Sequence, residues 1–165
     1  MIIGIDPGLK GAIALYDDLG VAYGEKKLLS IIDMPVEAKA TKGNRIDARS
    51  LLETISAINE GIETYGKHTA VIERVNAMPK QGVTSSFNFG EGYGVLRCAV
   101  STTTWPIVYV SPNKWKKDLD LTGKDKSYSI TKAKELMPEA ARFLTLKGHD
   151  GRAEAALIAY WYGNK

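Results

Sequence analysis

The chain begins with a short apolar run, residues 2–6, which ends on Asp6 and is followed directly by Pro7 and Gly8. A run of this length is typical of a buried strand, and a Pro-Gly pair ends a strand in a turn. The pattern therefore predicts a core strand with a carboxylate at its C-terminal end. Any fold that buries this strand must place an acid at one edge of its sheet.

The later apolar runs predict an α/β protein in which helices pack on a single sheet. Strands in a hairpin meander come first, and strands that alternate with helices follow, which indicates a mixed five-stranded sheet flanked by helices. At 165 residues the chain has the length of a single domain, residues 1–165. The expected strands are residues 2–6, 11–16, 20–32, 69–73 and 107–110, the expected helices are 46–65, 83–101, 127–137 and 150–160, and the expected flexible segments are 38–45 and 78–86.

Composition limits the partners and the location without identifying either. A net charge of +3 permits a polyanionic partner but does not identify one. The single cysteine, Cys98, excludes an internal disulfide, and its apolar surroundings at residues 94–100 predict a buried thiol in a reducing cytoplasm. No apolar run approaches the roughly 20 residues that a membrane helix needs. We therefore expect a cytoplasmic protein without a membrane span.

Acidic side chains occur at the ends of several predicted elements. Asp6 and Glu73 end strands, and Asp150 and Glu154 lie near the start of the last helix. If the strands of Asp6 and Glu73 are parallel neighbours, their C-terminal ends meet in the crevice where open α/β sheets bind ligands. Clustered carboxylates repel one another and need a cation, and oxygen ligands select Mg²⁺ or Mn²⁺. Two such ions about 4 Å apart hydrolyse phosphodiesters, so the set indicates phosphoryl transfer.

Each acid alone also has an ordinary structural interpretation. An Asp before Pro-Gly often forms a turn, and Asp150 is suited to capping a helix. Glu154, four residues further on, is equally suited to a surface ion pair. Glu73 is more informative, because it directly follows the core strand residues 70–72, where a lone acid would be poorly solvated.

Four segments together resemble the RuvC family of Holliday-junction resolvases. They are IGIDPG at residues 3–8, VIE at 71–73, HDGRAEA at 149–155 and MPKQGVTSSF at 78–87, and the last is similar to the phage-type branch of that family. The resemblance covers the whole chain and is more specific than any single acid. It implies an RNase H-like fold and a homodimer that makes paired nicks across a four-way junction. If the protein is phage-encoded, its location would be the cytoplasm of a bacterial host cell.

The resemblance also implies roles for the acids. Asp6 would bridge two Mg²⁺ or Mn²⁺ ions per active site, Glu73 would bind one of them, and Asp150 with Glu154 would complete the set. Bacterial members usually end in two aspartates three residues apart, whereas these two acids are four apart, which leaves open which one binds metal directly. Asn76 stands where bacterial members can carry an aromatic wedge, so activity on forks and flaps is expected beside junctions.

Basic and aromatic residues near these segments are candidates for DNA binding and dimerisation. Lys124 and Lys126 precede a helix N-terminus, which attracts phosphate. Surface lysines are otherwise simply solvated, and the tryptophans at 105, 115 and 161 are expected in the core. The aromatic residues at 87, 89 and 93 share one side of a predicted helix, where they would form either a dimer interface or part of the core packed against the sheet. The predicted phosphate-binding residues are Lys80, Lys114, Lys116, Lys117, Lys124, Lys126 and Arg152.

Two other functions remain as alternatives. One is an ATPase-like domain of the actin superfamily, since the strand followed by Asp6-Pro7-Gly8 resembles a phosphate-binding hairpin; 165 residues are too few for the two domains of such an ATPase. The other is a non-catalytic module that binds branched DNA, in which the acids are structural. Metal binding at the acids would distinguish this module from a nuclease.

Overall fold

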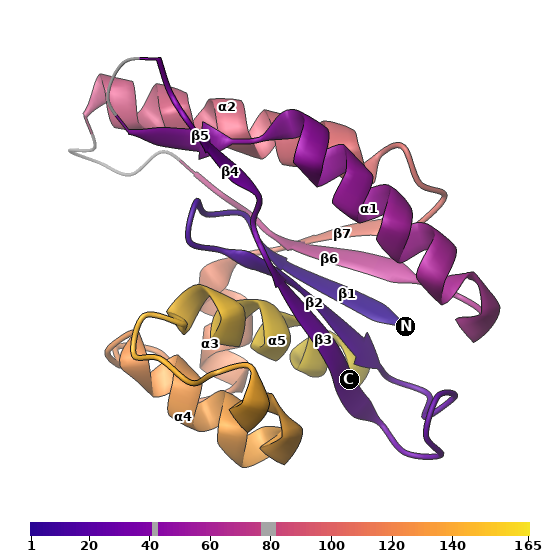
Figure 1. The fold of residues 1–165 in the computed structure, drawn as a ribbon. Coiled ribbons are helices and arrows are strands. Elements are labelled where there is room, and N and C mark those ends of the chain that lie inside the picture. The colour runs from indigo at the N-terminus through magenta and orange to yellow at the C-terminus, as the bar shows by residue number, and fades with distance from the viewer. Residues whose placement is uncertain (41–42, 77–81) are drawn as a thin grey trace.

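A five-stranded mixed sheet forms the centre of the molecule (Figure 1). The computed structural model describes residues 1–40, 43–76 and 82–165. The strands lie in the order β3-β2-β1-β6-β7, with β1 antiparallel to β2 and parallel to β6. The predicted α/β class and mixed five-stranded sheet are confirmed. The strand bounds are β1 Ile2–Asp6, β2 Ala12–Asp17, β3 Lys27–Asp33, β6 Thr69–Glu73 and β7 Ile107–Val110.

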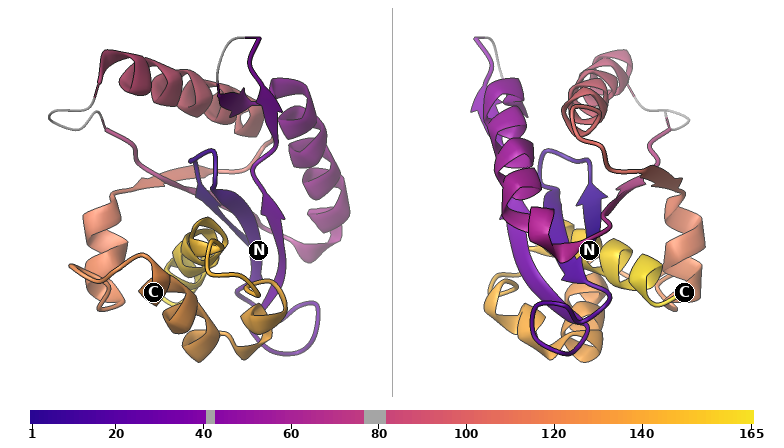
Figure 2. Two further views of the ribbon diagram at one scale, coloured as in Figure 1. Left: turned by 60° about the vertical axis from the view of Figure 1, so that its left-hand side comes forward. Right: turned by 90° about the vertical axis from the view of Figure 1, so that its right-hand side faces the viewer.

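Helices cover both faces of the sheet (Figure 2). One face carries α1 (Ala48–Ile62) and α2 (Val83–Val100), and the other carries α3 (Pro112–Asp118), α4 (Ser127–Leu136) and α5 (Asp150–Gly163). Two separate clusters of buried side chains fill the spaces on either side of the sheet. Short 3-10 helices follow α1 at Glu63–Tyr65 and α4 at Pro138–Arg142.

Alternation along the strands decides which face each acid points toward. Ile3 and Ile5 pack in the cluster under α1 and α2, whereas Ile2 packs in the cluster under α5. Side chains two residues apart in a strand share a face, so Asp6 points toward α5. In β6, Val71 packs under α5, and Glu73 points the same way for the same reason. The sheet therefore presents both strand-end carboxylates to the helix that carries Asp150 and Glu154.

Glycines allow α5 to lie unusually close to the sheet. A Cβ on Gly4 of β1 would lie 2.3 Å from the carbonyl oxygen of Ala155, and one on Gly151 would lie 1.9 Å from the carbonyl oxygen of Lys10. Both contacts are with backbone atoms, so no side-chain movement could relieve them. The N-terminal half of α5 is thus held directly against β1 and the loop that follows it.

The structure corrects several local predictions. The third strand begins at Lys27 rather than at residue 20, because residues 20–26 form turns. Of the segment expected to be flexible, residues 38–45, residues 41–42 lie outside the described residues. Its two ends belong to short paired strands, β4 (Val36–Ala38) and β5 (Asn44–Ile46), after which the chain enters α1. Ser111-Pro112 does not simply end β7 but starts α3, since Pro is favoured in the first turn of a helix.

The region expected to be flexible at residues 78–86 falls into two parts. Residues 78–81 lie outside the described residues, whereas α2 already begins at Val83. The predicted burial of Cys98 is wrong: the side chain is exposed, because α2 buries only Leu96, Ala99 and Val100. Within the described residues, no helix is long and apolar enough to cross a membrane.

Candidate active site

Asp6 and Glu73 stand at the same edge of the sheet, as predicted. Strands β1 and β6 are parallel neighbours with Ile5 paired to Ile72, so the acids that follow lie at adjacent strand ends. Burial raises the pKa of Asp6 to about 6, although the N–H of Gly8 donates a hydrogen bond of 3.1 Å to its Oδ1. The negative charge of Glu154 raises this pKa further. Asp6 is thus a largely desolvated acid with another acid nearby.

Glu73 is held by a side chain from α3. Burial raises the pKa of Glu73 to about 7, and the charges of Asp6 and Glu154 act in the same direction. The indole Nε1 of Trp115 donates a hydrogen bond of 2.9 Å to Glu73 Oε1, which partly opposes this shift. Because Trp115 is completely buried, this bond fixes one carboxylate oxygen from within the core.

Glu154 lies one turn into α5 and is buried, with 8% of its surface exposed. Lys116 Nζ lies 2.9 Å from Glu154 Oε1, and the hydroxyl of Ser129 lies 3.3 Å from the same oxygen. A buried carboxylate needs such partners, since an unpaired charge is costly away from water. The charge of Glu154 acts on both Asp6 and Glu73, so these three acids form one electrostatic group.

Asp150 begins α5 and has a more open environment. Its Oδ2 lies 3.9 Å from Nζ of Lys126, whose side chain is 79% exposed. An acid in the first turn of a helix also interacts favourably with the helix dipole. The structure therefore separates the two α5 acids: Glu154 acts on the strand-end carboxylates from a buried position, while Asp150 lies at the rim beside an exposed lysine.

The acids fit a divalent cation chemically, although they are not arranged around one point. Among the described residues, no three acidic, histidine or cysteine side chains converge closely enough to hold a metal ion. Lys116 and Lys126 lie against the α5 acids and supply positive charge, and both lower the pKa of Asp6. The pKa values of Asp6 and Glu73 are still raised despite these lysines, so additional positive charge would stabilise their ionised forms. Carboxylate oxygens are the donors that Mg²⁺ and Mn²⁺ prefer.

The predicted phosphate-binding residues divide into groups. Lys80 lies outside the described residues. Lys116 and Lys126 adjoin the acids, whereas the charge of Lys114 acts on Lys165 near the C-terminus. Lys117 and Lys124 are exposed, and Lys124 lies 5.4 Å from the ring centre of Tyr128.

Arg152 is already engaged by other parts of the protein. Its guanidinium makes a two-pronged ion pair with Asp33 at the end of β3, and it donates a third hydrogen bond to the carbonyl of Phe143. These contacts tie α5 to the sheet edge and to the segment before it. A role for Arg152 in binding phosphate stays a prediction that these contacts do not support.

Trp115 and Ser129 are the site residues that the sequence did not indicate. Trp115 was expected only as a core residue, and its burial is confirmed, but its N–H also contacts Glu73. Trp105 and Trp161 are buried as expected, and Trp161 donates to Asp118 rather than to the site. The sequence does hold one indication of this role: Trp115 is next to Lys116, one turn into the helix that follows β7.

Solved structures of Holliday junction resolvases are similar to this fold. Thermus thermophilus RuvC in complex with a Holliday junction superposes with a TM-score of 0.58 at 15% identity, covering 99% of this chain and 94% of that one. A second Thermus thermophilus RuvC structure gives 0.55 at 15% identity, covering 99% and 95%. The yeast mitochondrial Holliday junction resolvase Ydc2 gives 0.54 at 16% identity, covering 98% and 77%.

These likenesses settle the architecture. The chain has the RNase H-like fold of the RuvC resolvases over nearly its whole length, as the sequence predicted. No protein-family model matches the sequence, and no curated protein sequence matches it. At 15–16% identity the shared fold does not transfer an activity, so function must be argued from the residues of this chain.

Proposed function

We propose that this protein is a Mg²⁺- or Mn²⁺-dependent endodeoxyribonuclease that cuts branched DNA, chiefly four-way junctions and also forks and flaps. The observation that carries this proposal is the position of Asp6 and Glu73 at adjacent ends of parallel strands, with the charge of buried Glu154 raising the pKa of both. One protein with the same fold was solved with a Holliday junction bound, which supports this choice of substrate.

In this proposal Asp6, Glu73 and Glu154 hold two divalent ions, with Asp150 at the rim as a further ligand. Bound there, the ions would lower the pKa of an attacking water and stabilise the leaving 3′ oxygen of the phosphodiester. Trp115 donates to one oxygen of Glu73, Oε1, and so orients the carboxylate. Lys116 compensates Glu154 in the metal-free protein. Lys126, largely exposed beside Asp150, is suited to contacting the DNA backbone.

A homodimer is part of the same proposal, because paired nicks in a junction need two active sites. Support comes from α2, whose outer side exposes large apolar side chains: Val83 is 87% exposed and Phe87 is 72% exposed. Exposed apolar surface of this kind often marks an interface between proteins. Size-exclusion chromatography with light scattering should give a mass near twice the 18.0 kDa of one chain. A stable monomer at micromolar concentration would exclude paired nicking.

A non-catalytic DNA-binding module is the second candidate. The ion pairs of Lys116 with Glu154 and of Lys126 with Asp150 favour it, because they satisfy both α5 acids without metal. These ion pairs do not explain why Asp6 and Glu73 are buried with raised pKa values. A protein that only binds DNA has no need to bury two acids in this way, whereas strongly shifted pKa values are common in active sites. We therefore prefer the nuclease.

The test incubates the purified protein with a labelled four-way junction, a fork and a linear duplex, with and without Mg²⁺. We expect Mg²⁺-dependent nicks in the junction that disappear in Asp6→Asn and Glu73→Gln, while junction binding survives. If both variants cut normally, the site assignment is wrong. If wild type binds the junction without cutting it in Mg²⁺ or Mn²⁺, the protein is a binding module. Equal cutting of the linear duplex would remove the selectivity for branches.

A further inference from the structure

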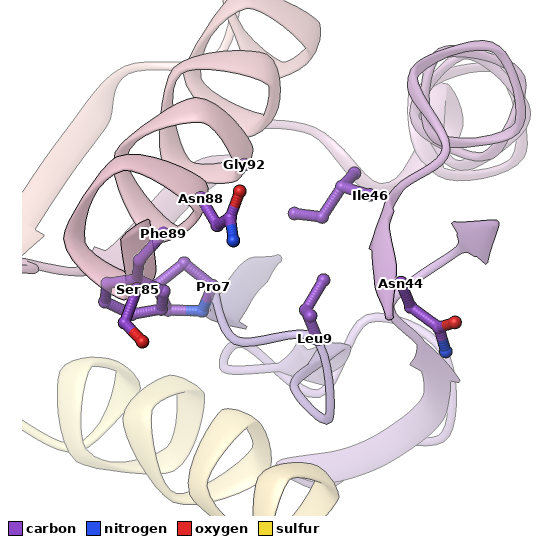
Figure 3. A pocket seen from close by; sticks show the side chains of 8 residues that line it. All are labelled: Pro7, Leu9, Asn44, Ile46, Ser85, Asn88, Phe89 and Gly92. Atoms are coloured by element: carbon purple, nitrogen blue, oxygen red, sulfur yellow. The ribbon is translucent and has the colours of Figure 1, made fainter. Parts of the chain in front are cut away.

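A pocket lies beside the candidate active site, on the opposite side of the loop after β1 (Figure 3). Its volume is about 320 Å³, and its walls come from that loop, from β5 and from the N-terminal half of α2. This volume is at the small end of the range for ligand pockets, roughly 300–1,000 Å³. The lining residues are Pro7, Leu9, Asn44, Ile46, Ser85, Asn88, Phe89 and Gly92.

The pocket adjoins the site because its first wall is the segment directly after Asp6. Asp6 points toward α5, while the next residue, Pro7, is buried toward α2 and lines the pocket. Leu9, two residues further on, also lines the pocket and is 44% exposed. A single tight loop, closed by a hydrogen bond from Gly11 N to Gly8 O, therefore separates the acids from the pocket. Leu9 stands three residues after Asp6, at most about 11 Å along the chain, so the pocket lies close to any phosphate held at Asp6.

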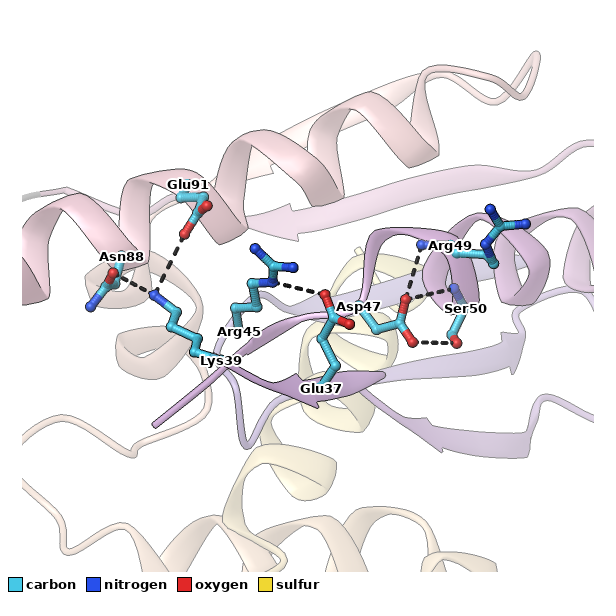
Figure 4. Close-up of polar contacts among 8 residues, drawn as sticks. All are labelled: Glu37, Lys39, Arg45, Asp47, Arg49, Ser50, Asn88 and Glu91. Carbon is cyan, nitrogen blue, oxygen red and sulfur yellow. Dashed lines mark hydrogen bonds and ion pairs between the residues drawn. The ribbon is translucent and has the colours of Figure 1, made fainter. Parts of the chain in front are cut away.

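The other walls are held together by specific contacts (Figure 4). A Cβ on Gly92 would lie 3.2 Å from Cδ1 of Ile46, so the missing side chain lets β5 approach α2. Lys39, only 18% exposed, donates a 2.6 Å hydrogen bond to Oδ1 of Asn88 and lies 3.7 Å from Glu91. These contacts connect the β4–β5 hairpin to α2 and keep the space between them open.

The contact with Lys39 also sets the orientation of the Asn88 amide. Because Oδ1 accepts from an ammonium, the other end of the amide must be the NH₂ group. In Figure 3 this NH₂ group is directed toward the loop that carries Pro7, and Leu9 and Ile46 lie to one side of it, on other walls of the pocket. The pocket therefore combines apolar walls with one oriented hydrogen-bond donor.

We propose that this pocket takes one unpaired nucleobase of the branched DNA, from a nucleotide next to the scissile phosphate. The inference rests on the proposed function, since it assumes that DNA lies at the acids. Phe89 offers a ring for stacking, Leu9 and Ile46 cover the base, and the Asn88 NH₂ group donates to an oxygen or ring nitrogen on its edge. Unpaired bases occur at branch points and are scarce in a duplex, so the pocket would favour branched substrates.

The test combines a change in the protein with a change in the DNA. An abasic site is placed in turn at each nucleotide within three positions of the mapped nick, and single-turnover nicking rates are measured. With wild type, we expect one position where removing the base lowers the rate by roughly tenfold or more, the usual scale for base stacking on an aromatic ring. Phe89→Leu should lower the rate on the intact junction by a similar factor and should no longer respond to the abasic site.

Tyr23→Leu is the control, because Tyr23 is an aromatic residue that is 69% exposed, follows β2 at the end of the sheet away from Asp6, and lies outside the pocket. This variant should keep the wild-type ratio of rates between intact and abasic junctions. Melting temperatures establish that each variant is folded. The inference is overturned if wild type nicks junctions but no abasic position matters, or if Phe89→Leu responds to the abasic site as wild type does. Absence of nicking by wild type would instead reject the proposed function itself.

Discussion

Helices α5 and α2 cover opposite faces of the same sheet, and the sheet holds them in different ways. Nine residues of α5 are buried, and backbone atoms of β1 and its loop touch the helix at Gly4 and Gly151. Only three residues of α2 are buried, although this helix is longer. Gly90 and Gly94 of α2 have no atoms within 4 Å of the position a Cβ would take.

This difference gives the two helices different roles: α5 is held rigidly in position, whereas α2 leaves much of its surface exposed. Because α5 cannot shift without a clash, Glu154 is fixed relative to Asp6 and Glu73, as a metal site requires. Helix α2 leaves a pocket and an exposed apolar side, which suits contacts with DNA or with a second chain. We therefore expect changes on α5 to act on chemistry and stability, and changes on α2 to act mainly on binding.

The largest effect should come from the buried acid of α5. Glu154→Gln removes a charge that acts on both strand-end acids, so nicking should fall at least about 100-fold. Asp150→Asn, at the rim of the same helix, should cost less, about tenfold. Single-turnover rates on a four-way junction measure both. A larger loss for Asp150→Asn than for Glu154→Gln would mean that metal binding rearranges α5.

A glycine-to-alanine substitution on each side of the sheet allows the packing of the two helices to be compared directly. Gly4→Ala pushes a Cβ against the backbone of α5 and should lower the free energy of unfolding by about 3 kcal/mol or more. Gly94→Ala enters open space on α2 and should raise it by about 0.5–1 kcal/mol through helix propensity. Urea denaturation measures both. Equal effects would show that α5 is not held more tightly than α2.

Burial beneath α5 also predicts a pH dependence of stability without metal. Because the folded-state pKa of Asp6 is raised to about 6, the cost of burying its charge is absent below about pH 4, develops between about pH 4 and pH 6, and is complete above pH 6. Asp6→Asn should therefore match wild type at pH 4 and be more stable by about 2–3 kcal/mol at pH 8.

Asp17, at the end of β2, provides a control of opposite sign. Burial raises its pKa, but hydrogen bonds from backbone N–H groups, including those of Ala22 and Leu19, hold it below the ordinary value. Asp17→Asn should destabilise the protein at neutral pH, and the difference should shrink as pH falls through the acid range. Thermal melts in EDTA across pH 4–8 test both variants. A pH-independent effect of Asp6→Asn would mean that Asp6 is not desolvated.

The smallest effect concerns Lys126, which precedes α4 and lies beside Asp150 at the start of α5. Lys126→Gln should weaken junction binding several-fold at low salt and reduce the slope of log affinity against log salt by about 0.9. Lys67→Gln, an exposed lysine just before β6 and so at the other end of the strands, should leave this slope unchanged. Fluorescence anisotropy at several salt concentrations measures it. An equal change in both variants would remove Lys126 from the DNA contact surface.

The strand-end acids could be predicted because local patterns decide them. Short apolar runs end on Asp6 and Glu73, and the structure confirms both strands with the same bounds. The start of α5 at Asp150 was also expected from composition. Alternation then fixes the face of each acid, since residues two apart in a strand share it.

Other features depend on contacts that no local pattern contains. The hydrogen bond between Trp115 and Glu73 joins residues 42 apart, and the ion pair of Lys116 with Glu154 joins residues 38 apart. The hairpin at residues 36–46 has short, exposed strands with weak patterning, so only its docking on α2 reveals it. Cys98 was misplaced because an apolar stretch predicts burial only where a partner surface covers it.

Calorimetric titration of the EDTA-treated protein with Mn²⁺ measures directly whether the acids beneath α5 bind a divalent metal. Wild type should show saturable binding of up to two ions per chain, and Asp6→Asn should weaken it at least tenfold while remaining folded. Because Glu73 has a pKa of about 7, binding at neutral pH should also release protons, measured as a dependence of the heat on the buffer. No binding by wild type, or equal binding by Asp6→Asn, would show that these acids do not form a metal site.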